Sequence, residues 1–328
     1  MKSQTSLKGR DFMEFWGNLL KILDAKMQVP TSYGWFHLTF FAISVNAGLL
    51  LCRFCKNPSE QFVKRLLFIS SLIVLILEVY KQINYTFIYD GATVKADYQW
   101  YAFPFQFCST PLYVGFVALL KSKRIHRACC SYLATFALFA GLCVMIYPQQ
   151  VFVSTAGINV QSMICHGMMI SVGIFLLGSG YVKTKHKTIL EAIPVFAVCV
   201  LLASLMNEIA YLSGLLETET FNMFFISPHC APSLPVYSLV QEVVPFPWCA
   251  FIYVLAFSAA AYLILLFAIL IRQNTKKCTQ KIPTALAVGF FFISCHLPIF
   301  ELSLGASFFL KSSSASGYYI SAPLWAKR

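Results

Sequence analysis

The chain has 328 residues, of which 58% are hydrophobic and 12% are charged, and its mean hydropathy is +0.69. Soluble domains carry about 25% charged residues, so this composition excludes an ordinary soluble domain. The formal net charge of +12 would suggest nucleic acid as the partner of a soluble protein, but here the basic residues lie between long apolar runs, so we expect anionic lipid headgroups and no nucleic acid.

Residues 1–34 form an N-terminal tail that mixes charged residues with a short amphipathic pattern, FMEFWGNLLKIL, at residues 12–23. This pattern predicts a helix that lies on the membrane surface, and a loosely ordered tail is the alternative.

Residues 35–272 contain repeated apolar segments, each long enough to cross a hydrocarbon layer of about 30 Å. A β-barrel would alternate polar and apolar residues, which these segments do not do. We therefore predict an all-α, polytopic membrane helix bundle, and its seven spans are 35–52, 66–85, 100–120, 129–147, 162–182, 188–206 and 248–271. A C-terminal extension, 273–328, holds an eighth candidate span at 282–303.

Basic residues gather in every second loop, and so on one side of the predicted membrane. They gather in 53–65, 121–128, 183–187 and 272–281, whereas 81–99, 147–161 and 207–247 hold only Lys81 and Lys95. Lys and Arg stay on the cytoplasmic side, so the N-terminus is predicted to be luminal or extracellular. The basic residues of the tail argue against this orientation, but the alternation across the later loops outweighs them. The endoplasmic reticulum and the plasma membrane are the expected locations.

The third predicted span contains the unusual stretch FPFQFCSTPLY at residues 103–113. Pro111 has no N–H, so the carbonyl of Phe107 loses its helical partner and needs another donor. A regular helix cannot direct both Gln106 and Cys108 into one cavity. We therefore expect the span to be distorted beside Cys108, where it lines a polar pocket.

Polar groups from four predicted spans share the luminal half of the membrane: Glu78, Lys81, Cys108, His166 and Asn207. Ionisable groups at this depth are costly and suggest function. Each also has a plain structural explanation. Glu78 and Lys81 are spaced to pair with each other, a lone cysteine usually packs, the histidine can be a hydrogen-bonded core residue, and the asparagine can cap a helix.

The same groups have the chemistry of acyl transfer. Cys108 can act as the nucleophile and His166 as the base that takes its proton, while Gln106 or Asn207 stabilises the oxyanion. Glu78 and Lys81 are candidates for substrate binding. The adjacent pair Cys295-His296 is a weaker candidate, because neighbours on a helix point about 100° apart.

Cysteine spacing gives no sign of a metal site. Cys52 and Cys55 form a CxxC pair, but no second Cys or His pair follows at zinc spacing. We predict no metal and no cofactor.

The longest predicted luminal connection is 207–247, which lacks Lys and Arg and contains the apolar stretch FNMFFI at 221–226. A connection of this length is usually functional or disordered. Its apolar residues favour a lid or a re-entrant cap that packs on the bundle.

The order of several short motifs resembles a known family. The motifs are Glu78…Lys81, FPFQFCS (103–109), a GL…YP stretch (Gly141, Leu142, Tyr147, Pro148), CHG (165–167), Asn207 at a span end, FNMFFIS (221–227) and PFPW (245–248). Over about residues 35–272 they resemble the YwaF-like bacterial integral membrane proteins and their eukaryotic relative, transmembrane protein 164.

This resemblance implies a seven-helix membrane bundle. For the branch of transmembrane protein 164 it also implies a CoA-independent acyltransferase, which moves polyunsaturated acyl chains from a diacyl phospholipid to a lyso ether phospholipid through a Cys and a His. The family's cysteine matches Cys108 and its later histidine matches His166. Bacterial members usually carry a histidine two residues before the cysteine, where this chain has Gln106.

Two functions therefore stand side by side. The first is a phospholipid acyltransferase that forms a Cys108 thioester in a luminal-leaflet cavity, with membrane phospholipids and lysophospholipids as substrates. The second is a transporter or a receptor-like ligand-binding bundle, in which Glu78 contacts the ligand and Cys108 is incidental. A structural membrane subunit is a third reading. Loss of acyl transfer in a Cys108→Ala variant distinguishes the first from the others.

Overall fold

The computed structural model describes residues 15–89, 93–214, 220–230, 235–246 and 248–281. The chain divides into two compact units, Met1–Leu270 and Ile271–Arg328, and the packing described below belongs to the first. The candidate span at 282–303 and the pair Cys295-His296 lie outside the described residues.

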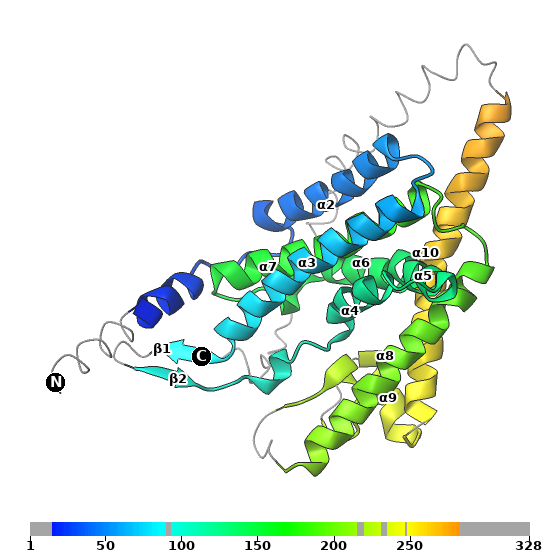
Figure 1. Cartoon of the computed structure of the whole chain (residues 1–328). Coiled ribbons are helices and arrows are strands. Elements are labelled where there is room, and N and C mark those ends of the chain that lie inside the picture. Colours follow the sequence, from blue (N-terminus) through cyan, green and yellow to red (C-terminus); the bar gives the residue numbers. More distant parts are fainter. Residues whose placement is uncertain (1–14, 90–92, 215–219, 231–234, 247, 282–328) are drawn as a thin grey trace, which may run out of the picture. The chain divides into compact units, whose positions relative to one another are not determined.

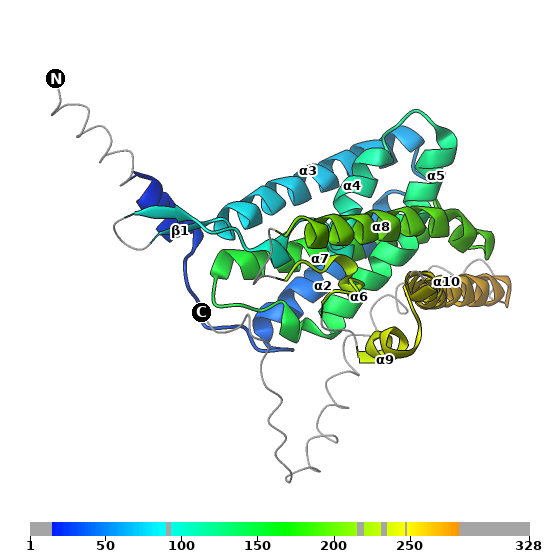
Figure 2. The ribbon, with the colours of Figure 1, turned by 90° about the horizontal axis from the view of Figure 1, so that it is seen from below.

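Helices make up most of the described chain, and Figures 1 and 2 show them from two directions. A first helix covers residues 15–23. The long helices are α2 (Trp35–Phe54), α3 (Glu60–Asn84), α7 (Ala156–Gly178), α8 (Lys187–Leu212) and α10 (Trp248–Lys281). The shorter helices are α4 (Thr110–Val117), α5 (Lys123–Tyr132), α6 (Leu138–Ile146) and α9 (Pro235–Val243). Single turns are η1 (Trp100–Ala102), η2 (Phe107–Ser109), η3 (Leu133–Ala137), η4 (Pro148–Gln150) and η5 (Met223–Phe225), and β1 (Phe87–Tyr89) pairs antiparallel with β2 (Val94–Ala96).

Five of the described helices are long and apolar enough to cross a membrane: α2, the continuous helix Lys123–Ile146, α7, α8 and Trp248–Asn274 of α10. They match five of the seven predicted spans. The predicted span at 66–85 corresponds to α3, a helix of 25 residues with charged side chains towards both ends, which is not among the five. The helical membrane bundle is thus confirmed, whereas the number of seven spans is not.

The predicted span at 100–120 is not a continuous helix. Only Phe107–Val117 forms an apolar helix, and at 1.5 Å per residue it rises about 16 Å, half of the hydrocarbon thickness. Residues 103–106 are not helical, and Pro104 lies among them. The two prolines of this stretch therefore shorten the helix, and Cys108 lies in its first turn.

Serine side chains set the start of two helices. Ser59 accepts a hydrogen bond from the Phe62 N–H at the start of α3, and Ser122 accepts one from the Ile125 N–H at the start of α5. Each satisfies one of the N–H groups that a helix leaves open at its N-terminus. The two capping serines lie in 53–65 and 121–128, two of the four segments in which basic residues gather.

Helix α7 lies at the centre of the packing that positions the site. It packs along α2, α6 and α3, and both views show α3 beside α7 with the β1–β2 hairpin at the end of α3. Small residues allow the close approach of α2 and α7: a Cβ on Gly167 would clash with Ser44, and the Ser171 hydroxyl donates to the Ser44 carbonyl at 2.7 Å. This is the pattern expected for membrane helices, where small residues and weak polar contacts replace the hydrophobic effect.

A stack of aromatic rings forms the core between α8, α10 and the connection after α8. Phe196 lies between Phe136, Phe224 and Tyr253, with ring centroids 4.5 to 6.2 Å apart. In the stretch 221–226, Phe221, Met223, Phe224 and Ile226 are buried. The prediction that this stretch packs onto the bundle is confirmed.

Candidate functional site

Cys108 lies in a distorted turn, as the sequence predicts. The Phe107 carbonyl, which cannot bond to Pro111, accepts hydrogen bonds from the Thr110 backbone N–H and, at 2.7 Å, from the Thr110 hydroxyl. The same hydroxyl lies 2.5 Å from the Tyr132 hydroxyl, which is fully buried. Thr110 therefore replaces the helical partner that proline removes, and it anchors the turn that carries Cys108.

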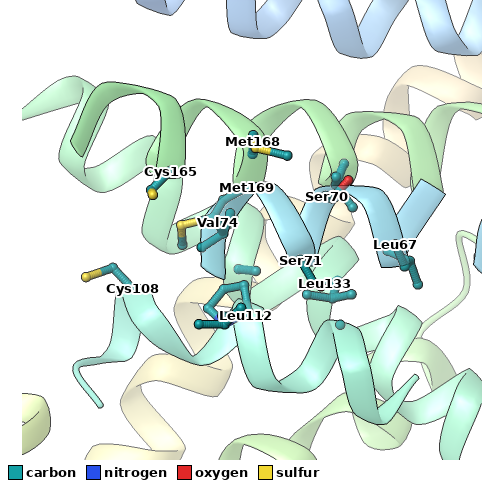
Figure 3. Close-up of a pocket in the computed structure, with 14 residues that line it drawn as sticks. Leu67, Ser70, Ser71, Val74, Cys108, Leu112, Leu133, Cys165, Met168 and Met169 are labelled. Atoms are coloured by element: carbon teal, nitrogen blue, oxygen red, sulfur yellow. The ribbon is translucent and has the colours of Figure 1, made fainter. Parts of the chain in front are cut away.

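The Cys108 side chain lines a cavity of about 40 Å³ between α3, α4, η3 and α7. Figure 3 shows Cys108 and Cys165 at one end of this cavity and Leu67 and Ser70 at the other. Most of the lining is apolar, including Leu112, Met169 and Val172. The prediction that the pocket beside Cys108 is polar is therefore wrong. A cavity of this size has room for one or two water molecules and not for a lipid chain.

Gln106 and Asn207 both bind the backbone of the connection after α8. The Asn207 amide donates to the Met223 carbonyl at 3.1 Å and accepts from the Met223 N–H at 2.8 Å. The Gln106 amide donates to the Asn222 carbonyl at 3.0 Å and accepts from the Phe224 N–H at 2.9 Å. Phe224 has φ of 59°, a conformation that non-glycine residues adopt at a cost. The two amides thus hold a strained turn, and neither lines the Cys108 cavity.

Glu78 and Lys81 form a network at the carboxyl end of α3. The Lys81 ammonium lies 2.7 Å from Glu78 Oε1, and the Gln82 amide donates to the same oxygen at 2.8 Å. Gln82 also donates to the Ala102 carbonyl at 2.9 Å and accepts from the Tyr98 hydroxyl at 2.7 Å. The pairing of Glu78 with Lys81, weighed as an alternative from the sequence, is present. Burial, followed by the Glu78 charge, raises the pKa of Tyr98 to about 12, so Tyr98 remains a donor at neutral pH.

Beside this network lies a groove of about 330 Å³, here called the α3 groove. Its lining residues are Leu75, Glu78, Val79, Gln82, Ile83, Thr86, Phe87, Pro104, Leu112 and Tyr113. Leu112 also lines the Cys108 cavity and so separates the two spaces. Gln82 and Tyr113 were not predicted as site residues, although the four-residue spacing of Gln82 from Glu78 is a signal that the sequence contains.

His166 on α7 is buried, and one of its two ring nitrogens is hydrogen-bonded. Its Nδ1 lies 2.7 Å from the Ser162 carbonyl, which assigns the proton to Nδ1, and 3.3 Å from the Ser162 hydroxyl. Its Nε2 is buried and has no hydrogen-bond partner among the described residues. In that same part of the chain, no hydrogen bond joins His166 to Cys108, and His166 is absent from the lining of the Cys108 cavity.

The predicted site residues therefore form four separate groups: Cys108 in an apolar cavity, Glu78 with Lys81 on the α3 groove, Gln106 with Asn207 on the strained turn, and His166 with Ser162. The structure does not place these residues around a single cavity. Within the described residues, no group of three or more His, Cys, Asp or Glu side chains is arranged to hold a metal ion.

Comparison with known proteins gives one match. The model of the TMEM164 family matches residues 31–270, which run from just before α2 to within α10 and include every predicted site residue. Neither the curated proteins nor the solved structures gave a match.

Proposed function

Because the chain belongs to the TMEM164 family, we propose that it is a multi-pass membrane acyltransferase that moves acyl chains between phospholipids without CoA. The observation that carries this proposal is the position of Cys108. Its thiol lies in a helix break, within the membrane domain, and lines a cavity next to a second, larger groove. A nucleophile in this position is close to the acyl chains of a lipid.

The proposed reaction has two steps. The Cys108 thiol gives its proton to a base, and its sulfur attacks the ester carbonyl carbon of a donor phospholipid. The C–O bond breaks, the leaving oxygen takes the proton, and a lysophospholipid departs while the acyl group remains on Cys108 as a thioester. The hydroxyl of a second lysophospholipid then attacks the thioester carbonyl, and its proton returns to sulfur. One ester replaces another, so neither CoA nor an oxidant is consumed.

His166 is the proposed base. The hydrogen bond from Nδ1 to the Ser162 carbonyl fixes the tautomer and leaves the lone pair on Nε2. Since a cavity of about 40 Å³ cannot admit a lipid, the proposal requires the helices around Cys108 to separate when substrate enters. The same opening is required to bring His166 to the thiol.

The decisive experiment measures acyl transfer and the acyl-enzyme together. Purified protein is incubated with a radiolabelled diacyl phospholipid and a lysophospholipid, and a hydroxylamine-sensitive acyl group is sought on Cys108. Cys108→Ala is expected to lose both the bound acyl group and the transfer, whereas Cys143→Ala, which removes an exposed cysteine of α6, keeps both. Full activity of Cys108→Ser would exclude a thiol nucleophile.

A receptor-like or transport function is the second candidate, and the α3 groove favours it. A groove of about 330 Å³ that holds a buried carboxylate is within the size range of small-molecule sites. In that case Cys108→Ala leaves ligand binding intact, whereas substitution of Glu78 weakens it.

A further inference from the structure

The α3 groove contains a buried carboxylate, that of Glu78, with hydrogen-bonded partners on only one of its two oxygens among the described residues. Glu78 is 6% exposed, and both of its hydrogen-bonded partners, Lys81 and Gln82, bind Oε1. No hydrogen bond reaches Oε2 from any residue that the structure describes. Because a buried carboxylate is stable only when its oxygens have donors, the second oxygen is suited to a donor that enters from the groove.

The groove offers this carboxylate next to an apolar wall. Glu78 and Gln82 lie four residues apart on α3, and Thr86, in the turn just after this helix, continues the spacing, so the three form a polar line. Leu75, Val79 and Ile83 recur at the same spacing and form a parallel apolar line. A ligand that fits both lines has one hydrogen-bond donor at its polar end and an alkyl chain beyond it.

The charge of the groove selects between possible donors. Lys81 lies 2.7 Å from Glu78 Oε1 and neutralises its charge, so the pair has no net charge to attract a cation. An uncharged donor, which a hydroxyl group supplies, suits the free Oε2 better than an ammonium group.

We propose that the α3 groove binds the acyl acceptor, a lysophospholipid whose free hydroxyl donates a hydrogen bond to Glu78 Oε2. This inference rests on the proposed acyl transfer and assigns a place to its second substrate. Leu112, which lines both spaces, is the wall between that hydroxyl and the Cys108 thioester, and its side chain moves aside for transfer. Glu78 acts here as a binding residue that orients the hydroxyl.

The test compares two lipids on the wild-type protein in nanodiscs: lysophosphatidylcholine, and the same lipid with its glycerol hydroxyl methylated. The methyl ether lacks the donor and carries one additional methyl group on the same oxygen. Loss of one charge-assisted hydrogen bond weakens binding about tenfold, so wild type is expected to bind the methyl ether about tenfold more weakly. Equal affinities would overturn the proposal, and this comparison needs no variant.

Variants then locate the effect. The double variant Glu78→Met with Lys81→Met, which removes the acceptor and leaves no unpaired charge, is expected to bind both lipids equally. Glu78→Gln keeps an amide oxygen as a weaker, uncharged acceptor and is expected to show a smaller preference for the hydroxyl. Glu60→Gln is the matched control, because Glu60 pairs with Lys64 at 2.9 Å near the opposite end of the same helix. A preference for the hydroxyl that persists in the double variant contradicts a role for Glu78.

The half-reactions separate this inference from the proposed function. Glu78→Gln is expected to form the Cys108 acyl group at the wild-type rate and to release it to lysophosphatidylcholine about tenfold more slowly. If wild type forms no acyl group on Cys108, the proposed function fails, whatever the lipid comparison gives. If the acyl group forms and is released equally fast in both proteins, the assignment of the acceptor site fails.

Discussion

Asn207 and Gln106 each bind backbone through both ends of the amide, at a turn where Phe224 has positive φ. An amide used in this way stabilises one conformation of the chain and cannot readily be replaced by a side chain of similar size. These hydrogen bonds indicate a structural role, whereas the sequence had suggested a chemical one. The distinction is open to test at both residues.

Asn207→Ala is expected to lower the stability of the protein by about 1–3 kcal/mol, because it leaves buried backbone groups of Met223 without partners. The thermal midpoint in detergent measures this effect. Asn46→Ala is the control, since the only hydrogen bond of its side chain within the described part of the chain goes to the Ala42 carbonyl of its own helix. Equal midpoints for the two variants would contradict the structural role of Asn207.

The Tyr98 hydroxyl gives a pH-dependent contribution. Its pKa rises from the ordinary value near 10 to about 12 because burial disfavours the ionised form. Folding therefore favours the protonated tyrosine, and the stability that it contributes is complete below pH 10 and is lost as pH rises towards 12. The difference in thermal midpoint between wild type and Tyr98→Phe is expected to shrink across this window. A difference that stays constant from pH 9 to about pH 12 contradicts the shift.

At the scale of elements, the distortion of the helix at Cys108 was predictable, but the hydrogen bonds that replace the missing helical one were not. The missing N–H of Pro111 is a covalent fact that the sequence contains, so the distortion followed from it. The donor that replaces it, Thr110, is one of several polar residues nearby, and nothing in the spacing singles it out. Its second contact, to Tyr132, depends on how α4 and α5 pack.

Thr110→Val keeps the shape of the side chain and removes its hydroxyl, so the Phe107 carbonyl retains a single donor. We expect a loss of about 1–2 kcal/mol in stability and a faster reaction of Cys108 with a thiol reagent, as the turn loosens. Mass spectrometry of the Cys108 peptide gives the labelling rate. Thr135→Val is the control, because among the residues that the structure describes the Thr135 hydroxyl bonds only to the Ser131 carbonyl of its own helix, at 2.7 Å.

The packing of α2 on α7 supports a second prediction at this scale. Gly167→Val places methyl groups against Ser44 and is expected to cost about 1–3 kcal/mol through overpacking. Ser44→Gly removes the obstacle, so the double variant is expected to regain part of the lost stability. A double variant as unstable as Gly167→Val would show that the contact with Ser44 is not the cause.

For the whole molecule, the sequence predicted a shared depth for the polar groups, but it did not predict the direction of their side chains. Glu78, Cys108, His166 and Asn207 were grouped from the sequence because helical rise fixes their distance from a span end. The direction in which each side chain points depends on the rotation of its helix and on its neighbours, which no spacing reveals. His166 accordingly faces Ser162 of its own helix and not the Cys108 cavity. The α3 groove depends on residues 104–113 lying beside α3, and that too is a tertiary contact.

The wall formed by Leu112 leads to a prediction at this scale. Leu112→Ala is expected to join the Cys108 cavity to the α3 groove, so that a lipid-soluble thiol reagent modifies Cys108 at least about tenfold faster. Leu112→Met, which conserves volume, is expected to react at the wild-type rate. Equal rates for Leu112→Ala and wild type would mean that the two spaces stay separate.

The hydrogen bonds of Gln106 also bear on how the protein is made. Its partners, Asn222 and Phe224, lie 116 and 118 residues further along the chain. A ribosome delivers the segment around Cys108 long before either partner exists, and that segment has too short a helix to enter the bilayer unaided. The segment that carries Cys108 can therefore make these hydrogen bonds only after α8 and the turn that follows it have been synthesised.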